Sequence, residues 1–287
     1  TIRELGEQTC WLLVQQAMGI PDAKMRTDFL TEKVAVLFFA EPSLPERLCV
    51  SAAVRQMGGA VGYEVDNAGD AWQRELHQHQ VHLMPIFDFY LDCLYLYGIP
   101  MKNVLRKEAC VDFPIINAGS PDAHPAHALA DIAYMIKNSR YLNSFPAAWL
   151  GSPNGTLYSL VAATAWFPFT IRIAMPKGTD TSYLESVIGD KSRVEIVDSI
   201  QDAVRDVKYI FAGSRFGINY PAIKEWELDR NVLSGADPTF KMFLGARPIN
   251  CLPIDQSLLG KGTSLLVEQS EFRLRIHKRI LHWVFKI

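Results

Sequence analysis

The stretch VLFFAEPSLPERLCV, residues 36–50, joins an apolar run to the start of a helix. A turn of this kind often binds an anion, because a helix start offers unpaired N–H groups and the positive end of the helix dipole. Here Ser43 stands at the N-cap position and Glu46 follows three residues later, which is the pattern of a capping box. Pro45 also removes one backbone donor. We therefore expect Glu46 to close this turn to a phosphate, with a repulsion of roughly 4 kcal/mol at an effective dielectric of about 20.

Short β-branched or aromatic runs alternate with helical patterns along the chain. Strands are expected at 33–40, 60–65, 92–97, 113–117, 146–151, 169–175, 193–197, 208–213 and 247–251, and helices at 44–57, 125–138, 156–167, 199–206 and 270–285. This alternation predicts an α/β fold with largely parallel sheets and with ligands outside the carboxyl ends of the strands. Because NSFP at 143–146 breaks the pattern, we expect a first domain at 1–142 and a second at 143–269. The last segment, 270–287, is expected to return as a helix that packs on the first domain.

The composition excludes several classes of protein. The 287 residues are 49% hydrophobic and carry a formal net charge of -2, which is ordinary for a soluble two-domain protein and does not suggest nucleic-acid binding. The basic stretch RLRIHKRILHW, 273–283, is interpreted as the solvated face of a helix. Five scattered cysteines without a C-x-x-C pair indicate reduced thiols in a cytoplasmic protein. The apolar runs are too short to cross a membrane, so we expect no membrane partner.

Two histidines flank the start of the helix in PIINAGSPDAHPAHALADI, residues 114–132. His124 precedes Pro125, and His127 lies one turn further on, so both imidazoles can project toward the strand ends. They are either an acid–base pair or two polar residues on a solvated helix start. No third ligand at suitable spacing is evident, and we expect no metal here. In HQHQVH, 77–82, an exposed segment is favoured over a metal site.

Two further stretches are candidates for ligand binding in the second half of the chain. WLGSPNGTLYSL, 149–160, lacks the G-x-G-x-x-G spacing and the later acidic residue of a dinucleotide site, so no cofactor is expected. In PINCLPID, 248–255, Cys251 either faces a ligand at a strand end or is a small buried residue. The amphipathic pattern of the last helix allows Arg273 to point inward.

In this order the stretches resemble the aspartate/ornithine carbamoyltransferase family. FFAEPSLPERLCVSAAVRQMGG is similar to the family's F-x-x-x-S-T-R-T-R segment, and INAGSPDAHPAHALAD to its N-A-G…H-P-T-Q-x-L-x-D segment. WLGSPNGTLYSL is similar to the start of its amino-acid domain, NCLP to H-C-L-P, and EQSEFRLRIHKRIL to its closing E-N-R-x-H helix. The resemblance implies two Rossmann-like domains, a homotrimer, active sites between subunits, and transfer of the carbamoyl group of carbamoyl phosphate to an amine.

The matching positions depart from the family pattern where the phosphate would bind. Leu44, Pro45 and Glu46 replace Thr, Arg and Thr of S-T-R-T-R, and Tyr97 replaces an arginine. His127 stands where the family has Gln. Each lost charged hydrogen bond is worth roughly 1.5–3 kcal/mol, so ordinary use of carbamoyl phosphate is not expected.

Our leading hypothesis is a divergent carbamoyltransferase-fold enzyme that acts on an amino-acid-like substrate in the cleft between the domains. The catalytic candidates are His124, His127 and Cys251, and the substrate-binding candidates are Ser43, Arg47, Tyr97, Asn154, Arg215, Leu252 and Arg273. The alternative is a non-catalytic paralogue that keeps the trimer and acts as a structural or regulatory subunit, binding a metabolite or a homologous catalytic chain. A third reading is a true carbamoyltransferase with rebuilt phosphate contacts.

Overall fold

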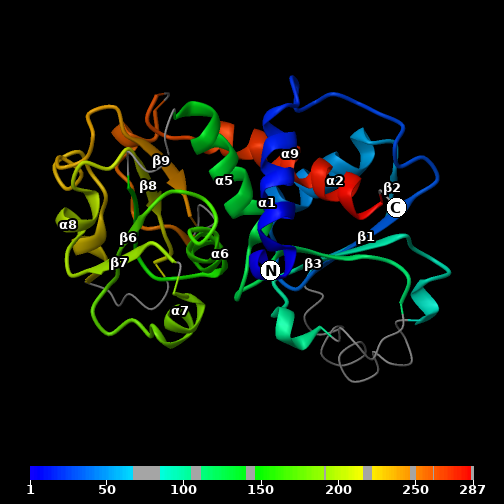
Figure 1. Cartoon of the computed structure of the whole chain (residues 1–287), viewed down its shortest axis with the longest axis horizontal. Helices are drawn as coiled ribbons and strands as arrows, with labels where there is room; N and C mark the ends of the chain where they lie inside the picture. Colours follow the sequence, from blue (N-terminus) through cyan, green and yellow to red (C-terminus); the bar gives the residue numbers. More distant parts are fainter. Residues whose placement is uncertain are drawn as a thin grey trace. The chain divides into compact units, whose positions relative to one another are not determined.

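The computed structural model describes residues 1–66, 85–104, 111–139, 146–190, 192–215, 222–245, 250–260 and 262–285. The chain forms two compact units (Figure 1). Unit 1 comprises Thr1, Gln8–Ala130 and Ser270–Ile287, and unit 2 comprises Ile2–Glu7 and Asp131–Gln269. The division falls within the helices α1 (Ile2–Met18), α5 (Pro125–Asn138) and α9 (Leu266–Val284), so each of these contributes residues to both units.

Unit 1 contains a four-stranded parallel sheet in the order β2-β1-β3-β4. The strands are β1 (Val34–Phe39), β2 (Ala60–Asp66), β3 (Cys93–Tyr97) and β4 (Ile115–Gly119), with the short helix η2 (Met101–Asn103) after β3. Helix α2 (Leu44–Gln56) connects β1 to β2 and packs against β2. The chain runs from β1 to β2 on one side and then crosses back to β3 on the other side of β1, so the strand order reverses between β1 and β3. In parallel sheets, ligand sites form at the carboxyl ends of such a pair.

Strands β1 and β3 read as nearly continuous apolar runs, as expected for a parallel sheet covered on both faces. All five residues of β3 are buried, and four of the six in β1 are. At the carboxyl ends, the rings of Phe39 and Tyr97 stack with centroids 4.9 Å apart. This stacked pair lies at the strand ends next to the candidate site in unit 1, because Tyr97 also contacts His124.

Unit 2 contains a five-stranded parallel sheet in the order β7-β6-β5-β8-β9. The strands are β5 (Ala147–Leu150), β6 (Ile171–Ala174), β7 (Val194–Val197), β8 (Tyr209–Ala212) and β9 (Lys241–Leu244). The helices within it are α6 (Gly155–Ala163), α7 (Ser182–Val187), α8 (Ile200–Val204), η4 (Ala222–Trp226) and η6 (Gln256–Leu258). Helix α8 packs on β5, β6 and β7, and the strand order here reverses between β5 and β8.

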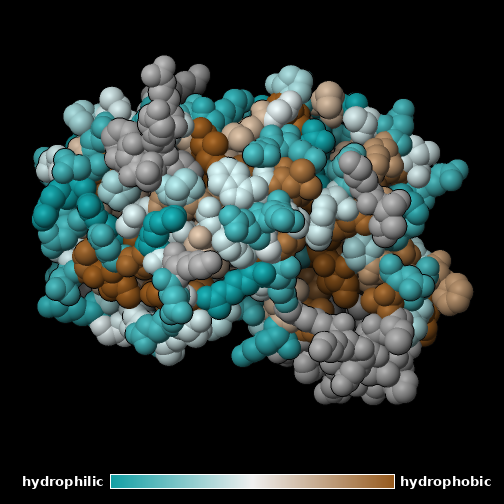
Figure 2. All heavy atoms as spheres, in the orientation of Figure 1, coloured by the Kyte–Doolittle hydropathy of each residue, from teal (hydrophilic) through white to brown (hydrophobic). Residues whose placement is uncertain are grey.

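The predicted α/β class with two parallel sheets is confirmed. The strand expected at 247–251 lies mostly outside the described residues, and the pattern did not indicate β9, whose KMFL is only four residues long. Within the described residues, no helix is long and apolar enough to span a membrane. The visible face of each unit is mixed, with apolar side chains in small groups between polar ones (Figure 2).

Candidate functional site

The start of helix α2 differs from the capping box that the sequence predicts. Ser43 occupies the N-cap position, but its side chain makes no capping hydrogen bond, and within the described residues its buried hydroxyl has no partner. The Glu46 carboxylate instead accepts a hydrogen bond from Nη1 of Arg273, at 2.6 Å from Oε1. The capping-box prediction is therefore wrong. A charge-assisted bond from a buried guanidinium is stronger than a bond from a neutral backbone N–H, and Arg273 lies 227 residues along the chain.

Helix α9 also differs from prediction, because three of its four Lys and Arg residues are buried and do not form a solvated face. Arg273 is 8% exposed, Arg275 3% and Lys278 6%. Arg275 donates to the carbonyl of Ile20 and forms an ion pair with Glu271, while Lys278 donates to the carbonyls of Ala23 and Met25 at 2.7 and 2.6 Å. The carbonyl groups that follow α1 thus satisfy cations that the sequence pattern alone assigned to water.

The loop between β4 and α5 fixes the position of His124. The Asn117 side chain accepts from the N–H of Gly119 at 2.8 Å and donates to the carbonyl of Ala123 at 3.1 Å. Gly119 has a φ of +139°, and a Cβ there would lie 2.7 Å from Nε2 of His124. Only glycine leaves room for the imidazole at this position.

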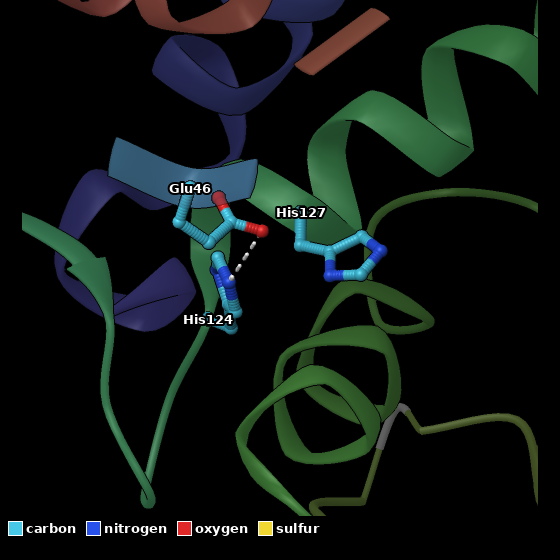
Figure 3. A group of neighbouring side chains, drawn as sticks. All are labelled: Glu46, His124 and His127. Atoms are coloured by element: carbon cyan, nitrogen blue, oxygen red, sulfur yellow. Dashed lines mark ion pairs between the residues drawn. The ribbon is translucent and has the colours of Figure 1, made fainter. Parts of the chain in front are cut away.

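Three side chains from the starts of two helices of unit 1, α2 and α5, meet beside this loop (Figure 3). Nε2 of His124 lies 3.8 Å from Oε1 of Glu46, and the rings of His124 and His127 are nearly perpendicular with centroids 5.1 Å apart. One possible ligand atom from each of Glu46, His124 and His127 lies within 4.8 Å of the other two. The ring of Tyr97 packs edge-on against His124, with centroids 6.4 Å apart. Glu46 is therefore a third potential ligand, which spacing along the chain did not reveal.

The electrostatic environment of these groups follows from their burial and their neighbours. Burial opposes the ionisation of Glu46, but Arg273, His124 and His277, with the hydrogen bond from Arg273, lower the pKa of its carboxyl below the ordinary value. Burial lowers the pKa of His124 to about 4, against the opposing effect of Glu46. Burial likewise lowers the pKa of His277 to about 4. Near neutral pH, the cluster therefore holds a charged Glu46–Arg273 pair and neutral imidazoles.

Sequence reasoning missed two members of this cluster, Tyr95 and His277. Their rings lie 5.8 Å apart, and both side chains are buried. Among the described residues, the Tyr95 hydroxyl, both ring nitrogens of His277 and Oε2 of Glu46 have no hydrogen-bond partner. The signal that could have found His277 is its spacing of four residues from Arg273, which places both on one face of α9.

The other predicted residues of unit 1 lie along α2 and β3. Arg47 follows Glu46, is half-buried, and its backbone N–H bonds to the carbonyl of Ser43 at 3.0 Å. Tyr97 ends β3 and is 6% exposed. The histidines of the 77–82 segment lie outside the described residues.

Four predicted residues belong to unit 2. The Asn154 side chain caps α6, accepting from the N–H groups of Thr156 and Leu157 at 2.9 and 3.2 Å. Arg215 is exposed just after β8, and its N–H donates to the carbonyl of Asn250 at 2.8 Å. Cys251 and Leu252 are buried in the apolar core, where the Cys251 thiol lies 3.5 Å from the carbonyl of Ala212. This packing favours a small buried residue, the alternative that the sequence left open for Cys251.

The first half of the chain matches a known protein family. Residues 1–137 match the family model described as the carbamoyl-P binding domain of aspartate/ornithine carbamoyltransferase. This match covers just under half of the chain and supports its assignment to that family. The curated relatives share less than a quarter of its residues, which is consistent with a divergent member.

The relatives extend over nearly the whole chain. The ornithine carbamoyltransferase of Nitratidesulfovibrio vulgaris strain DP4 is 23% identical over 300 residues, covering 99% of this chain and 97% of that protein. That of Oleidesulfovibrio alaskensis is 21% identical over 301 residues, with the same coverage. Among solved structures, ornithine carbamoyltransferase from Thermus thermophilus has a TM-score of 0.82 at 20% identity and covers 97% of this chain and 95% of its own. The enzyme from Burkholderia thailandensis has a TM-score of 0.83 at 16% identity, with coverage of 99% and 97%. These likenesses support the two-domain carbamoyltransferase fold.

Proposed function

We propose that this carbamoyltransferase-family chain is an enzyme that acts on an amino-acid-like substrate without binding carbamoyl phosphate at the β1–α2 turn. The observation that carries this proposal is the Glu46 carboxylate, which is 4% exposed and bound to Arg273. The matching domain of the family is described by its binding of carbamoyl phosphate. Here the corresponding turn presents an acid.

The electrostatics of the turn argue against a dianion. A phosphate beside Ser43 would meet the ionised Glu46, with a repulsion of roughly 4 kcal/mol at 4 Å and an effective dielectric of about 20. The charge of Arg273 is already compensated by Glu46, so it adds little attraction for a second anion. Pro45 offers no N–H to a ligand. The compound that donates the transferred group would therefore be neutral or singly charged.

The remaining groups suit a carbonyl. Because the pKa of His124 is lowered to about 4, its imidazole is neutral near pH 7 and can donate one N–H to a carbonyl oxygen. His124 is therefore not a general acid near pH 7, and of the roles that the sequence suggested for it, we keep hydrogen-bond donation to a carbonyl. In unit 2, the exposed guanidinium of Arg215 is suited to a substrate carboxylate, which is the basis for the amino-acid-like class.

Ligand-dependent thermal stability tests this proposal. Binding at a hundredfold excess over Kd adds about 2.7 kcal/mol, a rise in Tm of roughly 4–8 °C for a protein of this size. We expect no rise with inorganic phosphate or carbamoyl phosphate, and a rise with an amino acid such as aspartate or ornithine. A clear rise with carbamoyl phosphate contradicts the proposal.

A matched variant restores the family motif. The substitutions Leu44→Thr, Pro45→Arg and Glu46→Thr rebuild S-T-R-T-R, remove the acid and release Arg273. We expect this variant to gain a rise in Tm with carbamoyl phosphate that the parent lacks. If neither protein responds, the loss of phosphate binding has a cause outside this turn.

The packing of Cys251 in the core of unit 2 favours a second candidate, a non-catalytic paralogue that binds a metabolite or a homologous active chain. Absence of any response to amino acids, together with co-purification of a homologous chain, would support it. Both candidates include the homotrimer implied by the family resemblance, which sedimentation equilibrium would test.

A further inference from the structure

We propose that Glu46, His124 and His127 bind a divalent transition-metal ion, with zinc as the ion that best suits the donors. The proposal stands on this side-chain cluster and does not require the chain to be an enzyme. It concerns what the site holds in place of a phosphate, whereas the proposed function concerns what the β1–α2 turn excludes.

The geometry of the donors leaves space for an ion. Ligand bonds of about 2.0–2.1 Å in a tetrahedral zinc site place the ligand atoms roughly 3.4 Å apart. The Glu46 oxygen and the His124 nitrogen are 3.8 Å apart, which is too long for a hydrogen bond, and all three donors lie within 4.8 Å of one another. Side-chain shifts of about 1 Å or less would bring the three around one ion.

The two oxygens of Glu46 differ in their surroundings. Oε1, which faces His124, is held by Arg273, whereas Oε2, which points away from both imidazoles in Figure 3, is buried without a hydrogen-bond partner in the described residues. A buried carboxylate oxygen left unsatisfied costs stability, and a rotation of the carboxylate that brings Oε2 to an ion beside the imidazoles would remove that cost. Arg273 would then act as the outer partner that orients a metal-bound carboxylate.

The donors also restrict which ion fits. Two imidazoles and one carboxylate suit zinc, cobalt or nickel, whereas magnesium and calcium prefer oxygen ligands alone. The ion would bring two positive charges to a cluster whose acid is already balanced by Arg273. We therefore infer that the fourth position takes an anion, such as hydroxide or a carboxylate of the substrate.

Metal content of the purified full chain tests the proposal. Chelator-treated protein is loaded separately with Zn²⁺ and Co²⁺, dialysed, and analysed by elemental mass spectrometry and visible absorption. We expect one ion per chain, a tetrahedral Co²⁺ spectrum, and a rise in Tm of several degrees that EDTA reverses.

The variants locate the ion. His127→Asn should lose it and leave the Glu46–Arg273 pair intact, and His124→Asn should also lose it. His282→Asn is the matched control, because His282 stacks on Phe29 outside the cluster. A second control replaces His77, His79 and His82 with Asn and should retain the ion.

Glu46→Gln also tests the site, but it removes the partner of Arg273 and so lowers stability as well as metal binding, and His127→Asn therefore carries the decision. A full ion equivalent in His127→Asn, or no ion in the parent, overturns the proposal. Loss of the ion only in the variant of residues 77, 79 and 82 overturns it too, by placing the metal elsewhere. Because a bound ion would add positive charge beside Glu46, the response to carbamoyl phosphate is measured on chelator-treated protein, which keeps the two tests separate.

Discussion

Helices α2 and α6 each follow the first strand of a parallel sheet, but their starts are stabilised in different ways. At α6, the Asn154 side chain accepts from two backbone N–H groups and donates to the carbonyl of Gly245 at 2.9 Å. At α2, the Ser43 side chain makes no capping bond, and the acid three residues later binds Arg273 instead. One helix start is satisfied locally, and the other is built around a partner from the far end of the sequence.

The difference shows when a local pattern predicts a local contact. Asn154 is neutral, and the adjacent backbone N–H groups are suitable partners for its carbonyl oxygen. Glu46 is charged and 4% exposed, so a buried cation stabilises it more than a bond from a backbone N–H would. Capping patterns are therefore less reliable where the acid is buried beside a strand end.

The largest expected effect comes from breaking the buried pair at α2. Arg273→Met leaves Glu46 as a buried charge without its cation and should lower the free energy of unfolding by about 3–5 kcal/mol, measured by urea denaturation. The exposed pair Arg205–Asp202 is the control, and Arg205→Met should cost about 1 kcal/mol or less. A loss at Arg273 no larger than that at Arg205 would contradict the pairing.

The pH dependence of stability gives the next effect. Because the pKa of His277 is lowered to about 4 in the fold, the unfolded chain binds more protons between pH 4 and 6.5. Stability should therefore fall as pH falls through this range, by up to about 1.4 kcal/mol per pH unit for this residue. His277→Leu should reduce the slope in metal-free protein, and an unchanged slope would show that His277 titrates normally.

The local cap of α6 should have a smaller effect. Asn154→Ala removes two capping bonds and the bond to Gly245, and should lower the free energy of unfolding by about 1–2 kcal/mol. Chemical denaturation measures this directly. A change near zero would mean that α6 does not depend on its cap.

The smallest effect is expected at Ser43. Ser43→Ala removes a buried hydroxyl without a partner in the described residues, so stability should change by less than about 0.5 kcal/mol. Compared with Asn154→Ala under the same conditions, it separates the two helix starts. A loss above 1 kcal/mol would restore the capping role that the sequence predicts.

The fold could be read from the sequence because its strands are short apolar runs at regular intervals, such as CLYLY in β3. Strand β9 was not predicted because KMFL is only four residues long, although the turn-forming residues GADP, 235–238, precede it. The histidine pair was found because both residues lie at the first turn of a helix that follows a strand.

The cluster itself could not be predicted, because its key contacts are long-range. Glu46 meets Arg273 across 227 residues, and no local spacing encodes that distance. The burial of Arg275 and Lys278 depends on the carbonyls of 20–25, which a helical charge pattern does not reveal. From their charges we predicted that these side chains face solvent, whereas in the fold they are buried and donate to backbone carbonyls.

A double-mutant cycle between Glu46 and Arg273 is the most direct test of this account. Glu46→Gln and Arg273→Met are measured singly and together by urea denaturation. If each buried charge is stabilised mainly by the other, the double variant should be at least about 2 kcal/mol more stable than the sum of the two single losses predicts. Losses that simply add would contradict the claim that Arg273, and not the helix start, holds Glu46.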